Sequence, residues 1–355
     1  MNIYKACYNS ILTLELLPDS ITNESRNGII DPLHTKFRTN KVKVISMVDP
    51  FDDEEVITQD SSFHDLSFIY KTGEIVETSF DKNINKVCSD GIHYFKTYET
   101  AVSWYILQKN IKPDGTWIGW HENGQLEFEM TYKDGKADGI WREWYENDQI
   151  KSEKTYKDGK LDGIWKEWYE NGQLEYEKAY KDGNPDGTWR WWYKNGQLKH
   201  EETYKDGRGY GIWRGWYENV QLKYEEIYKD GKADGIWRRW YKSGQIKYEE
   251  AYKDGKENGT LRWWDENGQL EFEMTYKDGK ADGISRWYKN SQLVCERPYK
   301  DGKYDGTWRR WYKSGQLKSE WTYKDGKEDG TWRWWYENGK LNFERTYKDG
   351  KEEAG

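Results

Sequence analysis

Cys88 and His93 are the only nucleophile and base types that lie close together in the sequence, five residues apart. A cysteine–histidine enzyme needs an activated thiolate and a third group that orients the imidazole. The acidic neighbours Asp90 and Glu99 disfavour a thiolate. We therefore expect a packed cysteine and a histidine that caps a turn. The sequence predicts no catalytic residue, and the protein is not expected to be an enzyme.

Metal binding is the second chemistry that these residue types could support. His34 and His64 could join Cys88 and His93 around zinc, but the intervals of 30, 24 and 5 residues match no standard spacing. The acidic run at 52–55 lacks the spaced ligands and the glycine of an EF-hand loop, so a solvated loop is expected. The three cysteines are far apart, which is typical of reduced thiols in a cytosolic-type compartment. We expect no metal and no cofactor.

Charge and composition limit the class of protein. The 355 residues carry 64 acids and 56 bases, a formal net charge of −8, and show no basic stripe. Nucleic-acid binding is therefore not expected. Low hydrophobicity and 34% charged residues favour disorder, but 23 Trp, 29 Tyr and 9 Phe indicate buried aromatic surface. No apolar stretch is long enough to cross a membrane, and the N-terminus does not resemble a signal peptide.

A tandem repeat organises the second part of the chain. The string Tyr-Lys-Asp-Gly begins ten times, and eight of the nine intervals are 24 residues while one is 23. Its starts are Tyr132, Tyr156, Tyr180, Tyr204, Tyr228, Tyr252, Tyr276, Tyr299, Tyr323 and Tyr347. A fixed period of this length indicates a repeat architecture. We expect a module over 1–110 and ten repeats over 111–355.

Each repeat is predicted to be a β-hairpin. Asn195-Gly196 favours a two-residue type I′ turn, so that residues whose numbers sum to 391 face each other. Arg190 then faces Glu201, and Trp192 faces Lys199. The Lys-Asp-Gly segment is expected to form a second, longer turn. The short repeat contains Pro298, which predicts a local bulge or bend over 284–298.

The hairpins place aromatic and charged residues on the two sides of a pleated sheet. The glutamate at the position of Glu201 occurs in all ten repeats, and its expected partner is Arg or Lys in nine, with Ile118 as the exception. A second tryptophan is assigned to every repeat, Trp287 in the short one. The predicted binding surface contains Trp144, Trp168, Trp192, Trp216, Trp240, Trp311 and Trp335. The fold class is mainly β: an elongated, single-layer twisted sheet of 24-residue hairpins after a small α+β domain.

The N-terminal module shows mixed patterns. Residues 11–17 and 42–48 alternate as half-buried strands, and 63–70 and 74–80 flank a turn as a predicted hairpin. Residues 97–107 fit a short helix with Thr97 as its N-cap.

Residues 114–355 resemble the variant form of MORN repeats, with the core W-x-x-W-Y-x-N-G-Q-L-K-x-E-x-x-Y-K-D-G-K-x-D-G. Trp189, Trp192, Asn195, Gly196 and Glu201 carry part of this match in one repeat. The variant form occurs in bacterial antitoxin-like proteins and in giant viruses. The resemblance implies protein scaffolding, dimerisation or contact with membrane lipids.

The N-terminal part is similar to an uncharacterised module that precedes repeats in giant-virus proteins. The motif C-x-x-G-I-H-F-F matches at Cys88, Gly91 and His93, with Tyr94 in place of the first phenylalanine. The resemblance implies no known chemistry.

We therefore expect a non-catalytic repeat scaffold that mediates protein–protein interaction or self-association, with a homodimer formed through the C-terminal repeats. Peripheral binding to phospholipid surfaces is the alternative, although the acids nearly cancel the lysines of the turns. A catalytic N-terminal module with the repeats as a targeting arm is less favoured, and rows of tryptophan could also stack on sugars. No small-molecule substrate is expected. The expected location is cytoplasmic, in a host cell or a virion if the protein is viral.

Overall fold

The computed structural model describes residues 1–52 and 56–353, so most of the acidic run at 52–55 lies outside the described residues. The chain forms two compact units, Met1–Gly183 and Asn184–Gly355. The first unit contains the N-terminal module and three hairpins, and the second contains seven hairpins. The prediction of a mainly β chain with tandem hairpins after a small α+β module is confirmed.

The N-terminal module is built on a four-stranded antiparallel sheet with the order β1-β2-β4-β7. Two-stranded pairs β3-β8 and β5-β6 and the helix α1 complete it. The elements are β1 (Asn2–Ala6), β2 (Ile11–Leu16), β3 (Phe37–Thr39), β4 (Lys41–Val48), β5 (Gln59–Ser61), β6 (Ile69–Lys71), β7 (Ile75–Glu77), β8 (Ile92–Tyr94) and α1 (Tyr98–Lys109).

Alternation in the sheet produces the core of the module. Leu12 and Leu14 of β2 and Val42 and Val44 of β4 are fully buried, as the period-two pattern predicted. The helix begins after Thr97, whose hydroxyl accepts a hydrogen bond from the backbone N–H of Thr100 at 3.3 Å. The two predicted strands and the predicted helix are therefore confirmed.

The predicted hairpin over 63–70 and 74–80 is wrong. Gly73 makes the expected turn with a φ of +86°, but the strands on either side of it pair elsewhere. β6 pairs with β5, and β7 pairs with β4. The eight-residue β4 offers β7 a longer and more apolar partner strand than the three-residue β6 does.

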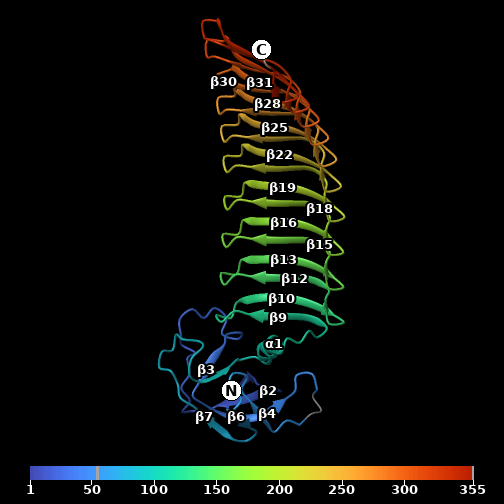
Figure 1. Ribbon diagram of the computed structural model, residues 1–355. Helices are drawn as coiled ribbons and strands as arrows, with labels where there is room; N and C mark the ends of the chain where they lie inside the picture. Colours follow the sequence, from blue (N-terminus) through green and yellow to red (C-terminus); the bar gives the residue numbers. More distant parts are fainter. Residues whose placement is uncertain (53–55, 354–355) are drawn as a thin grey trace. The chain divides into compact units, whose positions relative to one another are not determined.

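The first unit contains the hairpins β9–β10, β12–β13 and β15–β16, each followed by a two-residue strand. Their bounds are β9 (Gly115–Trp120), β10 (Leu126–Lys133), β11 (Lys136–Ala137), β12 (Gly139–Trp144), β13 (Ile150–Lys157), β14 (Lys160–Leu161), β15 (Gly163–Trp168) and β16 (Leu174–Lys181). Within the unit, neighbouring hairpins pair antiparallel in chain order (Figure 1).

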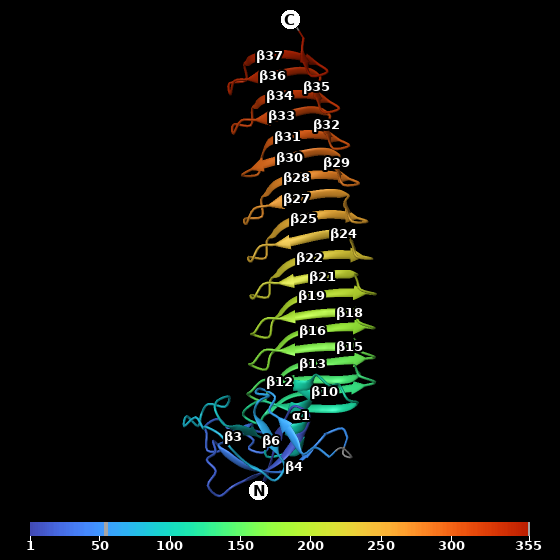
Figure 2. The same ribbon diagram turned by 60° about the horizontal axis from the view of Figure 1, so that its bottom comes forward.

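The second unit continues the same pattern. Its strands are β17 (Asn184–Pro185), β18 (Gly187–Trp192), β19 (Leu198–Lys205), β20 (Arg208–Gly209), β21 (Gly211–Trp216), β22 (Leu222–Lys229), β23 (Lys232–Ala233), β24 (Gly235–Trp240), β25 (Ile246–Lys253), β26 (Lys256–Glu257), β27 (Gly259–Trp264), β28 (Leu270–Lys277), β29 (Lys280–Ala281), β30 (Gly283–Lys289), β31 (Gln292–Lys300), β32 (Lys303–Tyr304), β33 (Gly306–Trp311), β34 (Leu317–Lys324), β35 (Lys327–Glu328), β36 (Gly330–Trp335), β37 (Leu341–Lys348) and β38 (Lys351–Glu352). These hairpins also lie side by side in an open sheet (Figure 2).

The two turn types are the reverse of the prediction. The type I′ turn lies at Asp206-Gly207, where φ is +48° and +77° and Lys205 pairs with Arg208. At the other turn only Gly196 has positive φ, and the loop has three residues. Its Asn195 side chain accepts a hydrogen bond from the backbone N–H of Gln197 at 3.0 Å, which stabilises this longer turn.

The longer loop changes the register near its own end of the hairpin. Arg190 faces Glu201 as predicted, but Trp192 pairs with Leu198 and a bulge leaves Lys199 without an opposite residue. The predicted pairing of Trp192 with Lys199 is therefore wrong.

The 23-residue repeat differs in its turn. Asn290 and Ser291 both have positive φ, so this hairpin closes with a two-residue turn in place of the three-residue loop. The register shift beside Trp287 has counterparts in the other hairpins, and the ladder continues to Pro298. Trp287 pairs with Cys295, as Trp191 pairs with His200, so it was wrongly assigned as a second tryptophan. Tyr288 holds that position.

Candidate functional site

The first tryptophan of a repeat and the tyrosine of its Tyr-Lys-Asp-Gly turn build a row of rings on one face of the second unit. The ring centroids of Tyr204 and Trp213 are 5.1 Å apart, and those of Trp213 and Tyr228 are 4.4 Å apart. The row continues through Trp237, 5.3 Å from Tyr228 and 4.7 Å from Tyr252. Tilted rings at these distances attract one another beyond their shared burial. We call this side of the second unit the aromatic face.

Three further positions on the aromatic face differ from hairpin to hairpin in the second unit. The first set is Trp191, Gly215, Arg239, Trp263, Trp287, Arg310 and Trp334. The residues opposite them are His200, Tyr224, Tyr248, Phe272, Cys295, Ser319 and Phe343. The third set is Glu202, Glu226, Glu250, Met274, Arg297, Trp321 and Arg345. The aromatic face therefore presents a different chemical surface at each hairpin.

Arginine and glutamate form a row on the opposite side, which we call the ladder face. Arg309 lies 3.8 Å from Glu320 of its own hairpin and 3.0 Å from Glu296 of the preceding one. Arg286 likewise reaches Glu296 at 3.7 Å and Glu273 at 2.9 Å. The predicted pairing within hairpins is therefore present, and pairing between hairpins extends it. The ladder face repeats where the aromatic face varies.

The second tryptophans of the predicted binding surface lie on the same side of their strands as the cross-strand ion pairs, because each stands two residues after the arginine of its strand, or after Lys166 in the case of Trp168. In the second unit this side is the ladder face. All seven that were predicted to bind a partner are half-buried: Trp144, Trp168, Trp192, Trp216, Trp240, Trp311 and Trp335. Their backbone carbonyls join neighbouring hairpins, as where Tyr193 Oη donates to Trp216 O at 2.9 Å. Their role in binding stays a prediction.

A groove interrupts the aromatic face in the second unit. Leu261 takes the place of a first tryptophan and is buried with 6% exposure. Beside it, Trp263 is 48% exposed. The groove has a volume of about 460 Å³ and is lined by Trp237, Arg239, Tyr248, Tyr252 and Trp263, among others.

A buried arginine organises the motif segment of the N-terminal module. Arg38 is fully buried and donates hydrogen bonds to four backbone carbonyls. Its acceptors are Lys86 O at 2.9 Å, Asp81 O at 2.8 Å, Asp90 O at 2.9 Å and Asn83 O at 2.6 Å. One side chain thereby fixes the loop that carries the motif residues.

Gly91 of the motif has a structural reason. Its φ is +139°, and a Cβ there would lie 3.2 Å from Thr39 O and 3.4 Å from Arg38 Cβ. A larger residue would push the loop away from β3.

Cys88 and His93 face different partners. Cys88 is exposed, with its Sγ 3.4 Å from Glu122 Oε1, so the expectation of a packed cysteine is wrong. His93 Nε2 lies 2.9 Å from Val87 O, which agrees with a histidine that caps a turn. Burial, together with the charges of Lys36 and Lys5, lowers the pKa of His93 to about 4.

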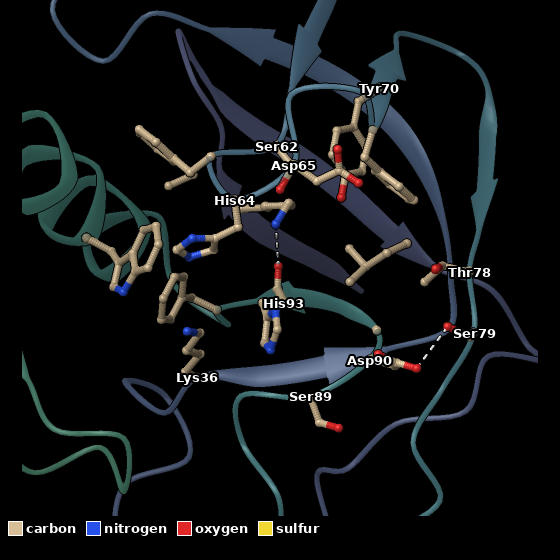
Figure 3. A pocket seen from close by; sticks show the side chains of 18 residues that line it. Lys36, Ser62, His64, Asp65, Tyr70, Thr78, Ser79, Ser89, Asp90 and His93 are labelled. Carbon is tan, nitrogen blue, oxygen red and sulfur yellow. Dashed lines mark hydrogen bonds between the residues drawn. The ribbon is translucent and has the colours of Figure 1, made fainter.

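A cavity of about 290 Å³ opens beside His93 in the module (Figure 3). Lys5, Lys36 and His64 contribute to its polar lining, and Asp65 and Asp90 are acidic groups in it. Further lining side chains include Phe63, Phe95 and Trp104, which supply an aromatic wall. Neither the cavity nor its buried lysine was foreseen, because residues distant in sequence form it.

The repeats match a known family. The family described as "MORN repeat variant" matches residues 113–134, 137–158, 161–182, 185–206, 233–254, 257–278, 304–325 and 328–349. The chain is a MORN-repeat protein. The family match covers eight of the ten MORN repeats counted in the sequence. The repeat of Val220 and the 23-residue repeat lie outside it.

The N-terminal module matches a "Family of unknown function (DUF5758)" over residues 2–101. The MORN-repeat chain is also 35% identical over 96 residues to "Uncharacterized protein L223" of Acanthamoeba polyphaga mimivirus, which supports the giant-virus connection. That match covers 26% of this chain and 60% of the relative's length.

Two solved structures gave weaker similarity. "Crystal Structure of TcdB2-TccC3-Cdc42" is 10% identical with a TM-score of 0.14, over 96% of this chain and 18% of that one. "Crystal Structure of TcdB2-TccC3" is 9% identical with a TM-score of 0.13, over 97% and 20%. TM-scores this low identify no shared fold.

Two observations bear on membranes and metals. Among the described residues, no helix has the length and apolar character needed to span a bilayer. In the same part of the chain, no group of three or more His, Cys, Asp or Glu side chains is arranged to hold a metal ion.

Proposed function

We propose that this MORN-repeat protein is a non-catalytic scaffold that binds a protein partner through the aromatic face of residues 184–355. The observation that carries the proposal is the contrast between the two faces. The ladder face repeats the same ion pairs, whereas the combination of residues at three positions of the aromatic face differs from one hairpin to the next. A surface that varies over an invariant frame can select a partner.

The groove suggests what part of the partner binds. Trp263 offers an exposed ring, and Tyr248 and Trp237 line the same hollow. The Arg239 side chain is 55% exposed beside them and pairs with Glu226 at 2.8 Å. Exposed aromatic surface with a rim arginine is typical of binding hot spots. A partner segment with an apolar side chain next to a carboxylate would suit this groove.

Paired variants test which face binds. Trp263→Ser with Arg239→Glu alters the aromatic face, and Ile212→Ser with Ile236→Ser alters exposed residues of the ladder face. Affinity capture from host extract should lose the partner only with the first pair. Equal loss with both pairs, or with neither, would contradict the proposal. Circular dichroism checks that each variant is folded.

Self-association is a second candidate, favoured by exposed apolar residues in the last hairpin. Tyr336, Leu341 and Phe343 are 54%, 50% and 39% exposed. Light scattering at tens of micromolar should show a dimer that Leu341→Ser with Phe343→Ser dissociates. A monomer for the unaltered chain would refute this candidate.

Co-sedimentation with vesicles of anionic lipid tests the membrane alternative. Replacing Cys88 and His93 tests the catalytic alternative, which predicts loss of phenotype in a chain that is still folded.

A further inference from the structure

Lys5 places a charged group inside the N-terminal module. It lies in β1 and is only 8% exposed. Its Nζ donates one hydrogen bond, to His93 O at 3.4 Å, and lies 5.7 Å from the centroid of the Tyr70 ring. No carboxylate of the described residues lies within ion-pair distance of it. Burying an ammonium without a counter-charge is costly, so the fold retains this group at an energetic disadvantage.

A second ammonium faces the same cavity. Lys36 Nζ lies 5.1 Å from the centroid of the Trp104 ring and 3.7 Å from Cys88 Sγ. In the close-up, Lys36 approaches His64 and His93 from the side opposite Ser79 and Asp90 (Figure 3). The same two lysines reach both histidines electrostatically. Burial first, and then the charges of Lys36 and Lys5, lower the pKa of His64 as well as that of His93.

We propose that this cavity binds a small organic anion, a carboxylate or a phosphate monoester attached to a planar apolar body. The ammonium groups of Lys5 and Lys36 hold the oxyanion, and Phe63, Phe95 and Trp104 contact the apolar body. A volume of about 290 Å³ suits a single-ring compound. The site belongs to the module and does not depend on the scaffold role of the repeats.

Two carboxylates in the lining determine how the anion lies. Asp90 Oδ2 accepts a hydrogen bond from Ser79 Oγ at 3.2 Å. Asp65 Oδ1 accepts hydrogen bonds from Ser67 N at 3.0 Å and Ser67 Oγ at 2.5 Å, and these bonds lower the pKa of Asp65. Both carboxylates are thus satisfied without either lysine. Their charge keeps the oxyanion on the side of Lys36.

Titration calorimetry with the full chain tests the proposal, using inorganic phosphate, phenyl phosphate and benzoate as probes. Lys5→Met and Lys36→Met each remove one ammonium, and Lys71→Met removes an exposed lysine of the same module as a control. We expect at least one of the two aromatic probes to bind to the unaltered chain. Its affinity should be about tenfold weaker for Lys5→Met and for Lys36→Met, and unchanged for Lys71→Met. Inorganic phosphate should bind more weakly than phenyl phosphate, because it lacks the ring.

The comparison of phenyl phosphate with benzoate distinguishes the two oxyanions. The proposal would be overturned if none of the three probes gave a heat of binding at concentrations up to roughly 10 mM, which is weaker than specific sites usually bind. Equal affinity of the unaltered chain, Lys5→Met and Lys36→Met would also overturn it. Lys36 is only partly buried, so its variant remains informative even if Lys5→Met fails to fold.

Discussion

The N-terminal module and the repeats both depend on arginine, but they use it in opposite ways. Arg38 is fully buried and donates its hydrogen bonds to backbone carbonyls beside the Phe80 ring, whereas Arg309 is partly exposed between two glutamates. In the module a single guanidinium supports a whole loop. In the repeats each ion pair contributes little to the free energy of unfolding, and many equivalent ion pairs together stabilise the sheet. Stability is therefore concentrated in one region and distributed in the other.

The largest expected effect is on Arg38. Arg38→Met removes a buried guanidinium and leaves four carbonyls without their donor, so we expect a loss of about 3–5 kcal/mol in the stability of the module. Hydrogen exchange followed by mass spectrometry should show residues 81–90 unprotected while residues 184–353 stay protected. Equal loss of protection in both regions would contradict the contrast.

The second largest expected effect is a loss of stability at acid pH that is confined to the N-terminal module. Because the pKa of His93 is lowered to about 4 from 6.5, the folded module favours the neutral ring. Its contribution is complete above pH 6.5 and is lost as the pH falls towards 4, by about 3 kcal/mol. Denaturant unfolding at several pH values measures this loss. His93→Gln should abolish most of it, whereas His64→Gln should retain most of it, because His64 is more exposed than His93.

Backbone strain provides a smaller effect in the repeats. Val220 has a φ of +61° at a loop position where most other hairpins have glycine. A β-branched residue is strained there, so Val220→Gly should stabilise the second unit by about 1 kcal/mol. Gly244→Val, at the matching position of the next hairpin, should destabilise it. Thermal unfolding compares the two, and shifts in the same direction would refute the explanation.

The smallest effect is expected on the ladder face. Arg309→Met breaks two partly exposed ion pairs and should cost at most about 1 kcal/mol, and less in high salt. Denaturant unfolding at low and high ionic strength measures it. If Arg309→Met lowered the free energy of unfolding as much as Arg38→Met does, the stability of the repeats would not be distributed over many equivalent ion pairs.

Local rules explain how much of the fold could be predicted. The repeat period, the facing of Arg190 and Glu201, and the helix after Thr97 follow from spacing and side-chain type alone. The two turn types were predicted at each other's positions because the sequences Asn-Gly and Asp-Gly both allow a type I′ turn. The choice depends on whether the asparagine side chain bonds to the backbone two residues on, as Asn195 does.

The module was harder to predict because long-range contacts decide it. β7 pairs with β4 and not with β6, its neighbour in the sequence, and Arg38 donates hydrogen bonds to carbonyls more than 40 residues away. The cavity around Lys5 and Lys36 likewise combines segments that no local pattern connects. Motif residues such as Gly91 signalled importance without indicating which contact required them.

Side-chain footprinting of the partner-bound chain tests the central claim most directly. Hydroxyl-radical labelling with and without the captured partner reports each face separately, because Trp263 and Phe343 lie on the aromatic face and Ile212 and Ile236 on the ladder face. The proposal predicts that the partner protects Trp263 and leaves both isoleucines unchanged. Protection of the isoleucines with Trp263 still labelled would contradict it.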